Sequence, residues 1–269
     1  MARGDQRSRN LRERARCRVA CEALARAIFR AVPGPTQEFQ FSAAPGAWRL
    51  SRAEPADDLR GLVLEYWEVE GALSAFRETL LPNGAVEVMI NLGPPHRVLS
   101  ATGQGVWERA WFSGLHEHAI IIESLAGTHL LSARLHALGA VALLGRRVVE
   151  SVNRIVDLDT FIESGGDALR VRALSATTVA NRFEALETFL RTQRANGEAV
   201  PEFVRIAAER IEQAHGNLRV ASLHEQLDAS RKHLAVSFRR YAGVSMKAYA
   251  KIRRFMWTLT RLQQSTSVS

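Results

Sequence analysis

The chain has 269 residues, an ordinary apolar share of 46% and a formal net charge of +8, and this length favours two globular units over one. It contains no apolar run near the roughly 20 residues that a membrane-spanning helix needs. The basic start is not followed by the apolar core of a signal peptide. We therefore expect a cytoplasmic protein that does not contact a membrane.

The positive charge is concentrated at one end of the chain. Residues 229–269 hold nine basic and no acidic residues, whereas residues 41–228 hold 24 acidic and 18 basic ones. A basic segment free of acids is typical of an element that binds a polyanion such as DNA, because each neutralised phosphate releases a counterion. A solvated basic tail explains the charge equally well, so the pattern within the segment has to decide.

Residues 1–40 are predicted to form a basic N-terminal extension. Residues 1–32 alternate apolar side chains with nine arginines, which favours a helix that Pro33-Gly34-Pro35 ends. Cys17 and Cys21 lie four apart in this segment, and the rest of the chain has no further cysteine. We expect both thiols to be reduced, with no zinc site and no disulfide framework.

Residues 41–195 are predicted to form a sensor or oligomerisation domain with trailing helices. Apolar alternation typical of half-buried strands begins at about residue 61, and Pro82-Asn83-Gly84 is a strong turn signal. Several short strands at this spacing indicate a small antiparallel barrel or sandwich. Tyr66 and Trp67 either line a ligand pocket or belong to the core, and the core is favoured. The predicted strands are 62–69, 86–90, 106–112, 118–123 and 129–135.

Helical patterns follow. We expect helices at 159–162 and 179–194, then a linker at 195–201 and an all-helical domain at 201–269. In that domain Ser230 is placed to cap a helix that Gly243 ends, and Ser245 to cap the last helix. The predicted helices of the domain are about 201–214, 221–227, 231–241 and 245–264.

Two short helices joined by three residues, with the second strongly basic, form the pattern of a helix-turn-helix. A helical wheel of residues 231–241 divides the second helix into two faces. The face predicted to be buried holds Leu234, Phe238 and Tyr241, and the exposed face holds Lys232, Ala235, Val236 and Arg239. An ordinary solvated helix pair is the alternative interpretation.

The same segment resembles a known family. A serine before the basic helix, Leu and Phe four apart, a glycine after it and then Ser and Tyr four apart are similar to the first helix-turn-helix and linker helix of bacterial AraC-type transcription regulators. The residues that carry this signature are Ser230, Leu234, Phe238, Gly243, Ser245, Tyr249 and Arg253-Arg254-Phe255. Upstream, Tyr66-Trp67, Leu81 to Gly84 and residues 139–145 resemble a poorly characterised, cupin-like domain often fused to such regulators.

This resemblance implies transcription regulation through double-stranded DNA, an unknown small-molecule effector and, as a further option, a homodimer. The base-reading positions fall on Lys232, Ala235 and Val236. The family usually has long polar side chains at the last two positions, so we expect poor or unusual sequence selectivity. The phosphate contacts fall on Arg231, Arg239, Arg240, Lys247, Lys251 and Arg254.

AraC-type regulators carry two helix-turn-helix units, and this sequence ends at Ser269, where the second would begin. With one unit, we expect monomer affinity for DNA to fall by orders of magnitude, and dimerisation to restore part of it. A truncated or decayed product is the other expectation. The alternative function is a ligand- or protein-binding module that has lost productive DNA binding.

A metal-binding cupin-like sensor is a further alternative. His116, His118 and Glu123 have the His-x-His-x4-Glu spacing of part of the cupin metal motif, in which imidazoles two apart on a strand share one side. A clean second motif is missing, with His129 and His136 as candidates only, so we expect no metal and no cofactor. Glycine-rich phosphate loops and nucleophile elbows are absent from the sequence, so we expect no enzyme.

Overall fold

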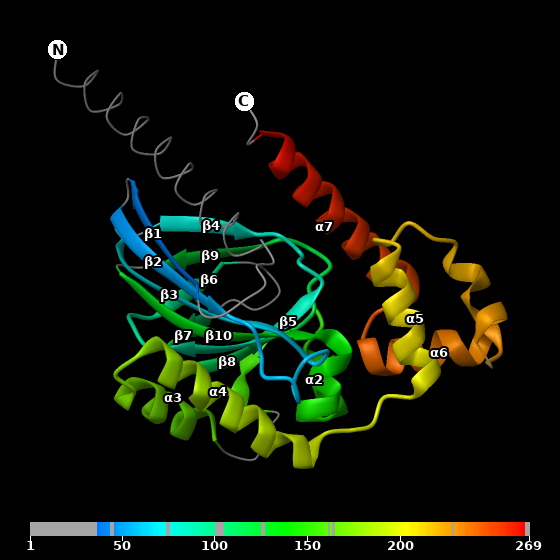
Figure 1. Ribbon diagram of the computed structural model, residues 1–269, viewed down its shortest axis with the longest axis horizontal. Helices are drawn as coiled ribbons and strands as arrows, with labels where there is room; N and C mark the ends of the chain where they lie inside the picture. Colours follow the sequence, from blue (N-terminus) through cyan, green and yellow to red (C-terminus); the bar gives the residue numbers. More distant parts are fainter. Residues whose placement is uncertain are drawn as a thin grey trace.

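The computed structural model describes most of the chain after the predicted N-terminal extension. The predicted helix within residues 1–32, Cys17 and Cys21 lie outside the described residues. The fold class is as predicted, with an antiparallel β sandwich followed by an all-α region (Figure 1). The described residues are 37–43, 46–73, 76–99, 105–124, 127–160, 162, 165–227 and 229–266.

Eleven strands in the described residues form two antiparallel sheets. The larger sheet has the order β1 (Gln37–Ala43), β2 (Gly46–Ala53), β3 (Val63–Leu73), β10 (Thr128–His136), β5 (Ala85–Asn91), β8 (Ala110–Ser113) and β11 (Ile155–Asp157). The smaller sheet has the order β4 (Phe76–Leu80), β9 (Ile120–Ser124), β6 (His96–Val98) and β7 (Gly105–Trp107). The predicted strand 106–112 is wrong as a single strand, because the chain passes from the smaller sheet to the larger one between Trp107 and Ala110.

The central strands β5, β8 and β10 of the larger sheet are buried on both faces, and adjacent residues of a strand point to opposite sides. On β3, Tyr66 faces the helices and stacks on Phe183 at 5.9 Å between ring centroids. Its neighbour Trp67 faces the sandwich interior. The interior core is therefore distinct from the core beneath the helices. Its buried members are Trp48, Leu50, Trp67, Val69, Met89, Val98, Trp111, Ile120, Leu130 and Ile155.

Helices cover the outer face of the larger sheet (Figure 1). Glu68 on β3 pairs with Arg182 of α4 at 2.7 Å, which ties that helix to the sheet. The prediction of a helix at 159–162 is wrong in extent, since only a single 3₁₀ turn forms there. The following helix was not predicted, because only Gly166, Leu169 and Ala173 are buried on it. The elements of this layer are α2 (Ala137–Leu144), η1 (Arg146–Ser151), η2 (Leu158–Thr160), α3 (Gly166–Ser175), α4 (Val179–Gln193) and η3 (Arg194–Asn196).

The C-terminal module consists of α5 (Glu202–Gln213), η4 (Val220–Gln226), α6 (Arg231–Ala242) and α7 (Met246–Thr266). The predicted caps are confirmed. The Ser230 hydroxyl accepts from the backbone N–H of His233 at 3.2 Å, and that of Ser245 accepts from Ala248 at 3.1 Å. Gly243 ends α6 at φ 76°, where a glycine is favoured. The segment predicted as a helix at 221–227 is a 3₁₀ helix.

The module packs directly against the sandwich unit. One hydrophobic core extends from the helix-covered sheet face through α2 and α4 into α5, α6 and α7. A Cβ on Gly243 would lie 2.5 Å from the Val152 side chain just after η1, so the end of α6 fits closely there. The linker predicted at 195–201 is also packed, since Gly197 lies against the carbonyl of Ala142 on α2. No helix among the described residues combines the length and the apolar composition that crossing a bilayer requires.

Candidate functional site

Helix α6 places the predicted base-reading residues on one exposed face. Lys232, Ala235 and Val236 are all exposed, and the Val236 side chain is 60% exposed although it is apolar. Leu234 and Phe238 are buried on the opposite side. The division into two faces that the helical wheel predicted is confirmed. The sequence from 229 to 269 holds no acidic residue, so this surface carries only positive charge of its own.

The predicted phosphate-contact residues are also exposed, although one of them has partners within the protein. The Arg240 guanidinium lies 4.0 Å from a carboxylate oxygen of Glu198 and 5.8 Å from the centre of the Tyr241 ring. Arg240 is therefore the candidate most drawn toward the protein body. The exposed candidates are Arg231, Arg239, Arg240, Lys247, Lys251 and Arg254.

A part-buried polar cluster joins the module to the sandwich. The Tyr249 hydroxyl of α7 donates to Glu212 of α5 at 2.5 Å, and His136 at the end of β10 lies 3.7 Å from the same carboxylate. Burial alone raises the pKa of Glu212, but the contacts from His136 and Tyr249 and the charge of Arg253 outweigh it and hold the pKa at about 2. The carboxylate therefore stays charged and fixes α5 and α7 against the end of the sheet.

A second contact joins α7 to the turn between β4 and β5. Gly84 in this turn has φ +72°, and a Cβ there would lie 3.2 Å from the Arg253 side chain and 3.3 Å from that of Ile252. The flanking residues Asn83 and Ala85 line a cavity inside the sandwich. This turn therefore contacts the cavity on one side and α7 on the other.

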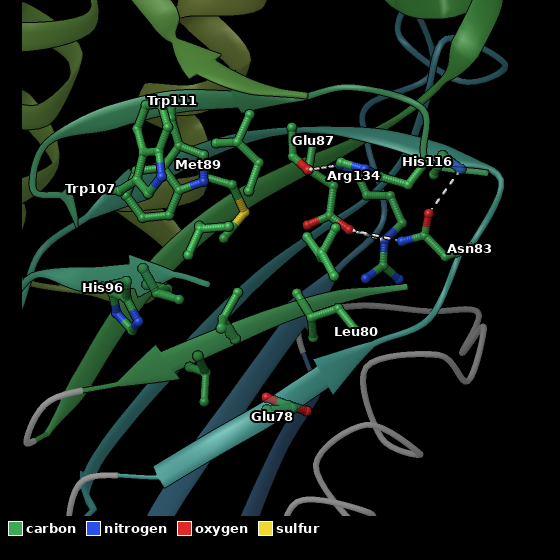
Figure 2. A pocket seen from close by; sticks show the side chains of 18 of the residues that line it. Glu78, Leu80, Asn83, Glu87, Met89, His96, Trp107, Trp111, His116 and Arg134 are labelled. Atoms are coloured by element: carbon green, nitrogen blue, oxygen red, sulfur yellow. Dashed lines mark hydrogen bonds and ion pairs between the residues drawn. The ribbon is translucent and has the colours of Figure 1, made fainter. Parts of the chain in front are cut away.

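The cavity lies between the two sheets and has a volume of about 130 Å³ (Figure 2). This compares with the cavity of about 150 Å³ that holds benzene in an engineered protein. Trp67, Trp107 and Trp111 contribute to its walls, together with aliphatic side chains and Met89. In the view of Figure 2, Trp111 and Met89 stand on the larger sheet, with Glu78 on the smaller sheet across from them.

Polar groups at this cavity lack partners. Among the described residues, six buried side-chain atoms have no hydrogen-bond partner, and five of these six belong to cavity-lining residues. Buried polar groups are nearly always paired, so a concentration of this kind marks a place where water or a ligand completes the hydrogen bonds. The five atoms are Nε1 of Trp67, Oε1 of Glu78, Nε2 of His96, Nε1 of Trp107 and Oγ1 of Thr128.

The end of the cavity next to the β4–β5 turn is polar but fully paired. Arg134 donates to Glu65 at 2.5 Å and to Glu87 at 3.0 Å, and Arg52 in turn pairs with Glu65. Asn83 donates to Glu87 at 3.1 Å, which links the turn to this network. Two arginines and two glutamates balance each other there.

Burial shifts the ionisation of three groups at the cavity. Desolvation raises the pKa of Glu78 to about 7. Desolvation also lowers the pKa of His96 and of His116 to about 4. Both imidazoles are therefore neutral near pH 7, and each has one hydrogen-bonded nitrogen, His96 with Ser124 and His116 with Ser113.

The metal candidates from the sequence do not form a cluster. His116 lines the cavity, His118 is exposed on the following loop, and Glu123 pairs with Arg77 and Arg97. The spacing argument requires one strand, but β9 begins only at Ile120 and places the histidines in the loop before it. In the described part of the chain, the group with metal-ligand proximity is Glu68, Glu70 and His129. Glu68 there already pairs with Arg182 and His129.

Sequence reasoning missed most of the cavity residues. Trp67 was considered for a pocket, but Glu78, His96, Trp107 and Thr128 were not. A glutamate at an inward position of an alternating strand was the available signal, because Arg77 and Thr79 on either side of Glu78 are exposed. The sequence did not predict the short strand β4, so the alternation around Glu78 could not be assigned to a strand.

Comparisons with known proteins cover part of the chain. Residues 51–157, from the end of β2 through β11, match the model of a family described as a domain of unknown function, DUF6597. A search of curated proteins found no match. One similar solved structure is described as the crystal structure of the AraC-like transcriptional activator CuxR. It shares 14% sequence identity and a TM-score of 0.38 over 79% of this chain and 81% of that one, which is too low to assign the same fold.

Proposed function

We propose that the protein is a DNA-binding transcription regulator of the AraC type and not an enzyme. The observation that carries this proposal is the form of α6. Ser230 caps its start, Leu234 and Phe238 anchor it on one side, and its other side exposes Lys232 and Val236. A short basic helix held in this way, behind the shorter helix η4, is suited to enter the major groove.

The contacts follow from the exposed face. Lys232 donates to a base edge, whereas Ala235 and Val236 offer only apolar contact, for example with a thymine methyl group. Arg239 on this face and Arg231 beside it neutralise phosphates, as do the exposed bases of α7. Since one side chain makes the directional contact, binding depends mainly on charge and discriminates weakly between sequences.

Control by a small molecule is part of the proposal. A ligand in the cavity touches the turn at residues 81–85 from the inside, and α7 touches the same turn from the outside through Ile252 and Arg253. A change in the conformation of the turn therefore changes how α7 packs against the sandwich, and with it the position of α6. The hydrogen bond that Asn83 donates to Glu87 offers a second connection between ligand and turn.

Titration of the full chain with duplex DNA at several salt concentrations tests the DNA-binding proposal. We expect affinity to fall steeply with salt, Arg239→Ala to weaken binding to all sequences alike, and Lys232→Ala to relax any preference at one or two base pairs. Arg172→Ala is the matched control, because Arg172 is an exposed arginine on α3. Absence of binding at low salt, or equal losses in all three variants, contradicts the proposal.

A ligand-binding module without productive DNA binding is the second candidate function. The unpaired polar groups of the cavity favour ligand binding independently of α6. Arg240 is directed toward Glu198, which reduces the charge available to DNA. The same titration separates the two candidates. A homodimer, which would double the DNA contacts, is tested by sedimentation with and without DNA.

A further inference from the structure

The charged groups at the cavity divide into a paired set and one unpaired carboxyl group. Arg134 is the arginine among the lining residues, and it already pairs with Glu65 and Glu87. Glu78 is 8% exposed, and its Oε1 has no hydrogen-bond partner in the described residues. A buried carboxylate without a partner is costly, so this position calls for a positive charge or a hydrogen-bond donor from another molecule.

This arrangement excludes anionic ligands. A carboxylate or phosphate ester in the cavity would find Arg134 already matched by two glutamates and would also face Glu78. His96 and His116 do not supply the missing charge, because burial lowers the pKa of each to about 4. An uncompensated negative charge would therefore gain nothing that offsets its loss of hydration.

The aromatic walls favour a cation. Trp67, Trp107 and Trp111 line the same cavity, and the face of an indole ring attracts an ammonium group more strongly when water is excluded. The indole N–H groups of Trp67 and Trp107 have no acceptor in the described residues. A ligand that satisfies them must carry an oxygen atom that accepts hydrogen bonds.

We propose that the cavity binds a small organic amine in its protonated form, with the ammonium group on Glu78 and a hydroxyl or carbonyl oxygen accepting from Trp67 or Trp107. The volume of about 130 Å³ is close to that of the benzene-binding cavity, so it limits the ligand to about one six-membered ring with small substituents. The role of this amine as an effector rests on the regulator function proposed above. Its binding does not.

Three compounds of nearly the same shape and different charge test the proposal on the unmodified protein. They are 4-(aminomethyl)cyclohexanol, 4-(hydroxymethyl)cyclohexanol and 4-hydroxycyclohexanecarboxylate, titrated by calorimetry at pH 8. We expect the amine to bind roughly tenfold or more tighter than the diol, since a hydrogen bond between charged groups is stronger than a neutral one, and the carboxylate to show no binding. Equal affinity for amine and diol, binding of the carboxylate, or no binding by any compound at millimolar concentration would overturn the proposal.

Two isosteric variants locate the charge that the amine contacts. Glu78→Gln should lower the affinity for the amine to that for the diol and leave the diol unchanged. Glu123→Gln is the matched control on the adjacent strand β9, where Glu123 pairs with Arg77 and Arg97 outside the cavity. Amine selectivity that survives Glu78→Gln contradicts the proposal, and so does selectivity that Glu123→Gln removes.

The pH dependence gives a readout that a structural role of Glu78 would not produce. The titratable or charged groups that face it across the cavity are His96, His116, Glu87 and Arg134. With a pKa of about 7, Glu78 is only about one-tenth ionised at pH 6, so the amine should bind roughly tenfold more weakly there than at pH 8. The diol should bind alike at both. Amine binding is measured without DNA, and DNA binding is measured without amine. Failure of the amine proposal is therefore distinguishable from failure of the DNA-binding proposal.

Discussion

Replacing Glu78 by glutamine should change how the stability of the ligand-free protein depends on pH. An unfolded glutamate has a pKa of 4.5, and burial raises the pKa of Glu78 to about 7 in the folded state. Between these values the folded chain keeps a proton that the unfolded chain releases. The free energy of unfolding therefore falls as pH rises, by about 1.4 kcal/mol per pH unit, or about 3 kcal/mol over the whole window.

Glu78→Gln removes this dependence. Between urea unfolding at pH 5 and at pH 8, the free energy of unfolding of the variant should rise by about 2.5 kcal/mol relative to that of the wild-type protein. The histidines of the cavity titrate in both proteins, so their contribution cancels in the difference. Glu123→Gln, on the outer face of β9, should show a much smaller change. A difference between variant and wild type that stays constant with pH would refute the inference that Glu78 is buried without a partner.

Three further substitutions test the module and its attachment to the sandwich. Ser230→Ala should cost about 1 kcal/mol by removing the cap of α6, and Ser230→Asp should restore most of it; urea unfolding measures both, and an unchanged Ser230→Ala midpoint contradicts the cap. Gly243→Ala should cost at least about 2 kcal/mol, because it combines a positive φ with a clash against Val152, and thermal unfolding near the wild-type temperature would count against this close fit. Tyr249→Phe should cost about 1 kcal/mol by removing one of the two contacts of the part-buried Glu212, and a stability equal to that of the wild type would show that water replaces the hydroxyl.

The turn at residues 81–85 connects the two proposals. If ligand binding changes the position of α7 through this turn, a substitution in the turn should reduce the effect of the ligand on DNA affinity. Ligand binding and DNA binding should each persist. Gly84→Ala tests this, because its Cβ would press on Arg253 and Ile252 of α7, and its positive φ adds strain in the turn that costs about 1 kcal/mol in an unfolding measurement. DNA affinity measured with and without amine should then respond less to the ligand than in the wild-type protein.

Local interactions determined the parts of the C-terminal module that the sequence predicted well. Ser230 caps α6 through a hydrogen bond to a residue three positions away, and Gly243 ends it by adopting a backbone conformation that other residues resist. The exposed and buried faces of α6 follow from the period of the helix. Beyond the first turns of α7, the apolar side chains Phe255 and Leu262 are exposed.

The cavity was decided by tertiary structure alone. Glu78, His96 and Trp107 come from three strands whose pairing fixes which side chains point inward, and a shift by one residue would turn each of them outward. The sequence could not assign Tyr66 and Trp67 to different surroundings, although Tyr66 packs under α4 and Trp67 lines the cavity. Spacing in the chain therefore determined the helices and their caps, whereas strand register across the two sheets placed the unpaired carboxyl group among the tryptophans.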